Sequence, residues 1–299
     1  MIEFAFATAL LLGQQTPPPQ DPPASQLEDV VVDGRSLRET VDRFVDDVIA
    51  PPVGRGPARW DRKVCIGVAN LRNETAQALI DQISSVALRV GLEIGEPGCS
   101  ANILVVAASD GQAMARALVD ARPLAFRPRY AGASRGGSAL ERFQADDGAV
   151  RWWHVSVPIH SETGGVAVRI PGYGAPLIRQ DNSRLTTRIQ NDLRRAFVVV
   201  DLDDAADVTV QQLGDFIGMV ALAQIDPEAD TASYNTILNL FGDEVAPAAM
   251  TDWDVSYLTS LYDAELNRRA PGQQSGEVSG IMFRDRDRAQ REDPAPEGD

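Results

Sequence analysis

Residues 64–121 carry the pattern that most constrains the fold. Apolar runs typical of strands, 64–69 and 103–107, alternate with segments of helical apolar spacing, 73–90 and 110–121. A further short strand is expected at 92–96. Strands that alternate with helices bury their apolar surface in layers, so the sequence predicts an α/β (α+β) domain with helices packed on a mixed β-sheet.

The following residues extend this pattern. Strands are expected at 152–158 and 166–170, around a glycine-containing turn, and again at 197–202. Residues 184–195 are predicted to be helical. Thr209, with Gln212 three residues later, has the spacing of a capping box that opens a helix to about Gln224. The apolar face of this helix is predicted to be buried and consists of Leu213, Phe216, Ile217 and Val220.

The two ends of the chain differ from its middle. Residues 1–13 are apolar and too short to span a membrane, which predicts a signal peptide, although an ordinary apolar N-terminus remains an alternative. Residues 14–26 form a proline-rich linker. A single globular domain is expected over 27–266, followed by a disordered charged tail over 267–299, in which residues 281–283 form an apolar island that would pack back on the domain. We therefore expect an exported protein, periplasmic or secreted.

Charge excludes one class of partner. The chain has 43 acidic and 28 basic residues, a formal net charge of −15. Nucleic-acid binding requires a basic face for the phosphates, so no nucleic-acid partner is expected. No integral membrane span is expected either.

The two cysteines, Cys65 and Cys99, flank neighbouring predicted strands. In an exported protein this placement favours one structural disulfide. Two buried thiols or a reactive pair are the alternatives. Neither cysteine has a histidine nearby in the sequence to support a reactive role.

The sequence contains few candidate motifs for catalysis, cofactor binding or metal binding. The sequence contains no phosphate-binding glycine loop and no nucleophile elbow, and we expect no cofactor. Asp226, Glu228 and Asp230 have the spacing of a calcium loop, but Thr231 stands where the loop requires glycine. The only two histidines, His154 and His160, are six residues apart. They are more typical of surface or partly buried side chains than of a metal site, which needs at least a third ligand.

Residues 213–262 carry a resemblance to a known class of enzyme. The segments LGDFIGMVALAQIDPEADTASYNTILNLF and MTDWDVSYLTSLYD are similar in layout to the active-site region of metzincin-type zinc proteases. In those enzymes a helix with the motif HExxHxxGxxH precedes a methionine-containing turn and a capped helix. Here residues 236–238 stand in the turn, and residues 251–262 stand in the final helix.

The catalytic residues of that class are not retained. Asp215, Met219 and Ile225 occupy the three histidine positions, Phe216 occupies the position of the glutamate, and Leu238 that of the turn methionine. Zinc proteolysis needs three ligands and a base that activates water. The resemblance therefore implies a degenerate zincin-like domain that keeps the packing of the helix without its chemistry.

The same features also resemble an uncharacterised proteobacterial family of exported proteins, the domain of unknown function 2927. The residues that carry this resemblance are the strand entry at Asn102–Ile103, the acidic loop after the helix and the step Leu261-Tyr262-Asp263. It implies an exported α/β domain and no known activity.

Two hypotheses of function follow. The first is a non-catalytic interaction or structural module with an unknown protein or peptide partner, held along an edge strand with Trp152 and Trp153 as anchors. A position in the core is the competing interpretation of these two tryptophans. The second is a peptidase-like metal-dependent hydrolase with His154, His160 and Asp215 as dispersed ligands. We expect no catalytic residues and no metal, and therefore favour the first.

Overall fold

A four-stranded mixed sheet organises the part of the chain that the computed structural model describes, residues 34–129, 133–167, 185–242 and 245–292. The strands are β1 (Ile66–Ala69), β2 (Ile103–Ala108), β3 (Val150–His160) and β4 (Ile189–Asp201), in the spatial order β1-β2-β4-β3. The pairs β1–β2 and β2–β4 are parallel, and β3 runs antiparallel to β4 at one edge of the sheet. The predicted α/β class is therefore confirmed.

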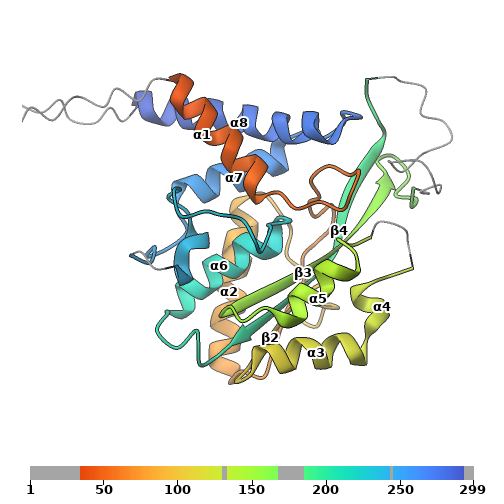
Figure 1. Cartoon of the computed structure of the whole chain (residues 1–299), viewed down its shortest axis with the longest axis vertical. Coiled ribbons are helices and arrows are strands. Elements are labelled where there is room, and N and C mark those ends of the chain that lie inside the picture. The colour runs from red at the N-terminus through yellow and green to blue at the C-terminus, as the bar shows by residue number, and fades with distance from the viewer. Residues whose placement is uncertain (1–33, 130–132, 168–184, 243–244, 293–299) are drawn as a thin grey trace, which may run out of the picture. The chain divides into compact units, whose positions relative to one another are not determined.

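Helices cover the two faces of this sheet (Figure 1). On one face, α2 (Asn73–Arg89) packs against α6 (Val210–Leu222). The opposite face carries α3 (Gly111–Ala121), the single turn α4 (Pro123–Phe126) and α5 (Gly137–Ala145). We call these the α6 face and the α5 face.

The remaining helices extend the core of the α6 face. They are α1 (Gly34–Val48), the 3₁₀ helix η1 (Ile237–Phe241), α7 (Asp252–Asp263) and α8 (Pro271–Glu292). Helices α1, α7 and α8 pack on one another, and their apolar side chains join the same buried cluster as α2 and α6 (Figure 1). A second, smaller cluster lies under α3, α4 and α5.

The prediction of a disordered tail over 267–299 is wrong for residues 271–292, which form α8. This helix buries a narrow stripe in which Val278 and Met282 are fully covered by α1 and α7. Ser256 of α7 also donates a hydrogen bond to Asp285 at 2.6 Å. Few apolar residues are needed for so narrow a contact, which is why the composition of the segment did not predict a helix. The apolar island at 281–283 does pack against the core, as expected.

The helix predicted at 184–195 is also wrong. From Ile189 onward these residues belong to β4, which pairs with β3 over its whole length. The register shifts at Val155/Ser156 of β3, where β4 contains one extra residue. Such a bulge interrupts the alternation of side chains along a strand, which removes the period-two signal from the sequence.

The predicted disulfide is confirmed. Cys65 and Cys99 are bonded, with their Cα atoms 6.1 Å apart. The bond joins the residue before β1 to the segment that leads into β2. Because a parallel bridge also pairs Val64 with Ile94, the β1 side of the sheet is fastened both covalently and by hydrogen bonds.

The signal peptide and linker expected at 1–13 and 14–26 lie outside the described residues, as does the tip of the tail, 293–299. Within the described residues, no helix combines the length and the hydropathy that crossing a bilayer requires.

Candidate functional site

Helix α6 is buried on nearly all sides. The predicted capping box is confirmed: the Thr209 side chain accepts a hydrogen bond from the Gln212 amide, and Gln212 reaches back to the Thr209 amide. Phe216 is 4% exposed, as predicted, and packs edge-on against Trp152 and Phe241. A buried phenyl ring, with no group that could act as a base, thus stands at the position that the resemblance in sequence assigns to the general base of zinc proteases.

The residues that the same resemblance assigns to the three histidine positions are also engaged in contacts within the protein. Met219 and Ile225 are buried among apolar side chains. Asp215 is 2% exposed, and its two carboxylate oxygens accept hydrogen bonds from the Gln82 side chain at 2.7 Å and the Met250 amide at 2.9 Å. The carboxylate therefore ties α6 to α2 and to the segment before α7.

The turn after α6 is fastened by a single buried carboxylate. Asp254, at the third position of α7, forms the capping box with Thr251 and also accepts hydrogen bonds from the Thr236 hydroxyl and the Ile237 amide. Burial raises the pKa of Asp254, and its hydrogen bonds act against this rise. The start of α7 and the start of η1 are thus held by one group.

Side chains from other elements form hydrogen bonds with the carbonyl oxygens at the carboxyl end of α6. The last carbonyl groups of a helix have no partner within the helix, so a buried helix end needs other donors. Here His154 bonds to the Val220 oxygen at 2.7 Å, the Trp60 indole donates to Ala221 and the Tyr262 hydroxyl to Leu222. The Trp152 indole donates to the Ile225 oxygen at 2.9 Å. Two residues of β3, Trp152 and His154, therefore hold the sheet against this helix end.

His154 is neutral under ordinary conditions. Its pKa is lowered to about 4, mainly by burial and also by the nearby guanidinium of Arg135, although the hydrogen bond to Val220 acts in the opposite direction. A carbonyl oxygen only accepts, so Nε2 of the ring carries the proton. Nδ1 is then the acceptor.

The alternative metal ligands are not brought together. His160 lies six residues beyond His154 on β3, which at about 3.3 Å per residue separates them by about 20 Å. His154 bonds to the carbonyl of Val220, whereas Asp215 lies five residues earlier, near the middle of α6, and bonds to Gln82 and Met250. Among the described residues, no three His, Cys, Asp or Glu side chains lie close enough to hold a metal ion.

Over part of its length, the edge of β3 has no neighbour among the described segments. In an antiparallel pair, alternate residues direct their backbone N–H and C=O groups toward the partner strand and away from it. The Asp201 amide donates to the Ala149 oxygen, so odd-numbered residues of this part of β3 direct these groups toward β4. The backbone groups of Val150, Trp152 and His154 therefore point away from β4. Farther along, Ser156 donates to the Ala133 oxygen and His160 to the Gly165 oxygen, so the chain itself covers the edge there.

A cavity of about 340 Å³ follows this open edge. One wall is α5, with Ala139 and Phe143, and the other is the loop after α6, with Ile225 and Pro227. Trp152, Trp153 and His154 line it from β3. We call this cavity the edge groove.

The two tryptophans belong to the core and to the groove at once. Trp152 is 9% exposed and Trp153 is 4% exposed, and both indole nitrogens donate to backbone oxygens. Successive residues of a strand point to opposite faces, so the two rings flank the edge from the two sides of the sheet. Both rings are largely buried, so each offers only a small part of its surface to the groove, and their N–H groups are already bonded.

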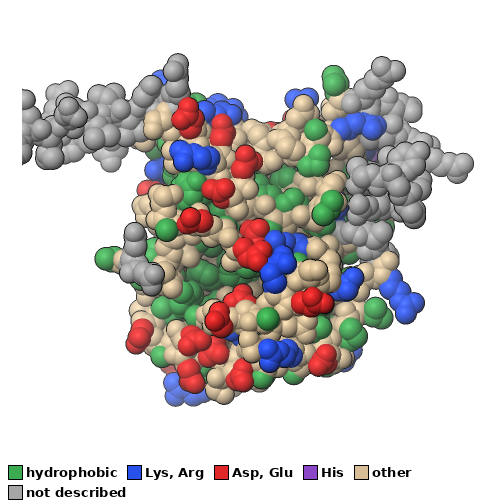
Figure 2. Space-filling model, in the orientation of Figure 1, with side chains coloured by type: hydrophobic (Ala, Val, Ile, Leu, Met, Phe, Trp, Pro, Cys, Tyr) green, Lys and Arg blue, Asp and Glu red, His purple; other side chains and the backbone are tan. Residues whose placement is uncertain are grey.

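Two ion pairs connect the walls of the edge groove. Arg135 pairs with Asp226 at 2.9 Å and Arg142 with Glu228 at 2.8 Å. The first pair is about one-quarter exposed on both sides, and the second is more than half exposed. Figure 2 shows acidic and basic side chains next to one another at the centre of the face that carries α5. Asp226 and Glu228, two of the three carboxylates with the spacing of a calcium loop, therefore form ion pairs with arginines.

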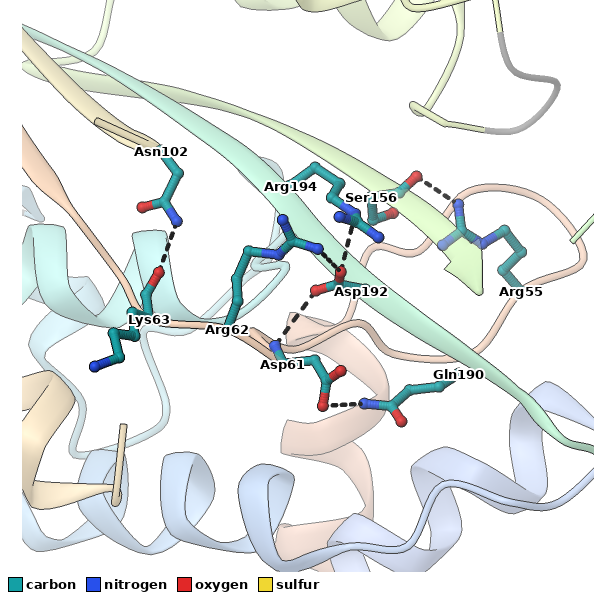
Figure 3. A network of polar contacts seen from close by, with 9 residues as sticks. All are labelled: Arg55, Asp61, Arg62, Lys63, Asn102, Ser156, Gln190, Asp192 and Arg194. Carbon is teal, nitrogen blue, oxygen red and sulfur yellow. Dashed lines mark hydrogen bonds and ion pairs between the residues drawn. The ribbon is translucent and has the colours of Figure 1, made fainter. Parts of the chain in front are cut away.

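A further polar cluster lies where β4 bulges (Figure 3). The buried carboxylate of Asp192 pairs with Arg194 at 2.9 Å and Arg62 at 3.4 Å, and accepts a hydrogen bond from the Asp61 amide. Burial nevertheless raises its pKa to about 6. This cluster fastens the segment before β1 onto β4.

Sequence reasoning missed these polar partners. Arg135 and Asp226, like Arg62 and Asp192, are far apart in the chain, and no local spacing links them. Only the pairing of β3 and β4 and the path of the loop after α6 place them together.

Comparison of the chain with protein-family models, with curated proteins and with solved structures finds no match.

Proposed function

We propose that this protein is an exported, non-catalytic interaction module that binds an extended peptide along the open edge of β3. One observation carries the proposal: backbone groups of an edge strand that have no partner among the described residues face a cavity flanked by two tryptophans. A peptide that adds a strand to such an edge gains main-chain hydrogen bonds, and pockets beside the edge select its side chains.

The absence of a catalytic role rests on the residues of α6. Phe216 has no ionisable group, and Met219 and Ile225 cannot replace imidazole ligands. Asp215 already accepts two hydrogen bonds inside the protein. The order of α6, η1 and α7 supports a degenerate zincin-like layout, in which a substrate-holding edge would persist after the chemistry is lost. The disulfide supports export, because such bonds persist in oxidising compartments.

The test compares two substitutions at one position. Proline at His154 removes the outward amide proton, whereas His154→Ala keeps it, and both lose the imidazole. Proline is compatible with an edge position, and Pro158 already occupies one with the same orientation on β3.

A display library of unstructured octapeptides, selected on the whole protein, supplies the probes. Selected peptides should bind His154→Ala about as well as the wild type and His154→Pro about tenfold more weakly, the value of one hydrogen bond. They should also protect the Trp152 and His154 amides from hydrogen exchange. If no peptide is selected, or if selected peptides bind both variants equally, the edge-groove proposal is wrong.

A further inference from the structure

The α5 face is incompletely covered, and its uncovered part is a trough made of two adjoining hollows. Their volumes are about 630 and 460 Å³, and they share Leu124, Ala125 and Arg195. The trough lies on the face of the sheet, whereas the edge groove lies beside β3, and the two have no lining residue in common. We call it the arginine trough.

The floor of the arginine trough is apolar. Leu104 of β2, Phe197 of β4 and Val157 of β3 contribute side chains from three neighbouring strands. At the rim, Leu124 is 58% exposed and Val166 is 47% exposed. Large apolar side chains that remain exposed beside one another mark a binding surface more often than isolated ones do.

Basic side chains surround this apolar floor. Of the residues that the structure describes, three arginines and no acidic residue line the trough, in a chain whose net charge is −15. Arg122 and Arg195 line the trough and are exposed, and neither forms an ion pair within the described residues. Arg194 lines it as well and pairs with Asp192. The trough is therefore complementary to a ligand that is both apolar and anionic.

Most of the strand backbone under the trough is already paired. Strand β2 pairs with β1 and with residues 196–201 of β4, and Arg195 and Phe197 of β4 pair with β3. A peptide in an extended conformation would lie here with its own amides unsatisfied, which is costly in an apolar environment. An alkyl chain carries no such groups. Cavities of this size are also typical of sites for small apolar ligands with a few polar contacts.

We propose that the arginine trough binds a monomeric single-chain amphiphile with an anionic head group, of which a fatty-acid carboxylate is the simplest example. The alkyl chain lies on Leu104, Phe197 and Val157, and the head group pairs with Arg122 and Arg195. Arginine suits this role because its planar guanidinium binds a carboxylate or phosphate through two parallel hydrogen bonds.

The experiment uses dodecanoate below its micelle-forming concentration as the probe, with binding to the whole protein measured by calorimetry. Dodecyltrimethylammonium, with the same chain and the opposite charge, is the matched control ligand. Dodecanoate should bind, and the cation should bind at least about tenfold more weakly.

Matched variants locate the site. The double substitution Arg122→Gln/Arg195→Gln should weaken dodecanoate binding by about tenfold or more, since charge-assisted hydrogen bonds are the stronger kind. Arg89→Gln removes an exposed arginine of α2, which packs on the α6 face, and should leave binding unchanged. Leu124→Gln should weaken binding of the alkyl chain of dodecanoate without affecting folding, because the Leu124 side chain is largely exposed.

Three outcomes would overturn the proposal. Equal binding of both amphiphiles would show a surface without charge preference. An equal response of the double variant and Arg89→Gln would place the site elsewhere. Binding to vesicles that contain anionic lipid, or to an acidic peptide, without binding to monomeric dodecanoate would show that the trough contacts a membrane surface or a protein instead.

Discussion

The two faces of the sheet differ in how completely helices cover them. On the α6 face, long helices bury a large apolar cluster, and even the carboxyl end of α6 has a donor for each of Val220, Ala221 and Leu222. On the α5 face, three shorter helices cover a smaller cluster and leave the arginine trough and one wall of the edge groove. Complete burial gives stability, and incomplete burial leaves surface that a ligand can cover. We therefore assign stability chiefly to the first face and binding to the second.

The largest effect should come from the core of the α6 face. Phe216→Ala removes a ring packed between Trp152 and Phe241, and should lower the free energy of unfolding by about 3–5 kcal/mol. Phe143→Ala on the α5 face also removes a buried ring, but one that lines the edge groove, where the surroundings can relax or admit water. Its cost should be lower by about 1 kcal/mol or more. Urea unfolding measures both, and equal costs would remove the distinction between the faces.

The two edges of the sheet also differ, because a disulfide holds the β1 edge whereas part of the β3 edge is open among the described residues. Cys65 and Cys99 are 34 residues apart, and closing a loop of this length stabilises a fold by about 3–4 kcal/mol in the chain-entropy model. The oxidised protein should unfold at a higher urea concentration than Cys65→Ser/Cys99→Ser, and reduction of the wild type should reproduce the difference. Coincident unfolding curves would show that hydrogen bonds alone fasten the β1 side.

A pH-dependent effect should arise where β3 meets α6. The pKa of His154 is lowered to about 4, against about 6.5 in the unfolded chain. Above pH 6.5 the ring is neutral in both states, and its contribution is complete. As the pH falls from 6.5 to 4, the unfolded chain takes up the proton first, so stability is lost, by at most about 3 kcal/mol.

The variant His154→Gln isolates this contribution, because its amide can still donate to Val220 but does not titrate. The stability of the wild type relative to the variant should fall between pH 6.5 and 4. Asp192 has the opposite sign, since a pKa raised to about 6 makes the folded protein bind a proton first and gain stability as the pH falls. That term is common to both proteins and cancels. A difference that is independent of pH would contradict the buried, neutral histidine.

The smallest effects should come from the ion pairs that join the walls of the edge groove. Exposed ion pairs contribute about 0.2–1 kcal/mol, and salt screens them. A double-mutant cycle on Arg142 and Glu228 should therefore give a coupling near the lower limit. The cycle on Arg135 and Asp226, which are less exposed, should give a larger one. Couplings in the reverse order would show that exposure does not govern these contacts.

Local patterns were sufficient for much of the α6 face. Local spacing predicted the capping box at Thr209 and the burial of Phe216. The positions of Cys65 and Cys99 beside predicted strands indicated their disulfide. The spacing of His154 and His160 also had a consequence that holds for any strand. Six residues extend over about 20 Å, so the two rings cannot share a metal ion.

Local patterns failed where contacts between distant segments decided the structure. Residues 189–195 became part of a strand because β3 pairs with them, and α8 formed because α1 and α7 cover Val278 and Met282. An isolated segment of such composition has little reason to fold, since helix formation in proteins depends on tertiary packing.

The sequence by itself determined the α/β class, the disulfide and the buried helix α6. The tertiary structure decided that the unpaired edge of β3 meets a cavity, that Arg135 and Arg142 connect its walls, and that Arg122 and Arg195 surround an apolar floor. The physical reason is range: periodicity and capping act over a few residues, whereas a binding surface consists of groups from separate elements that only the packed sheet brings together.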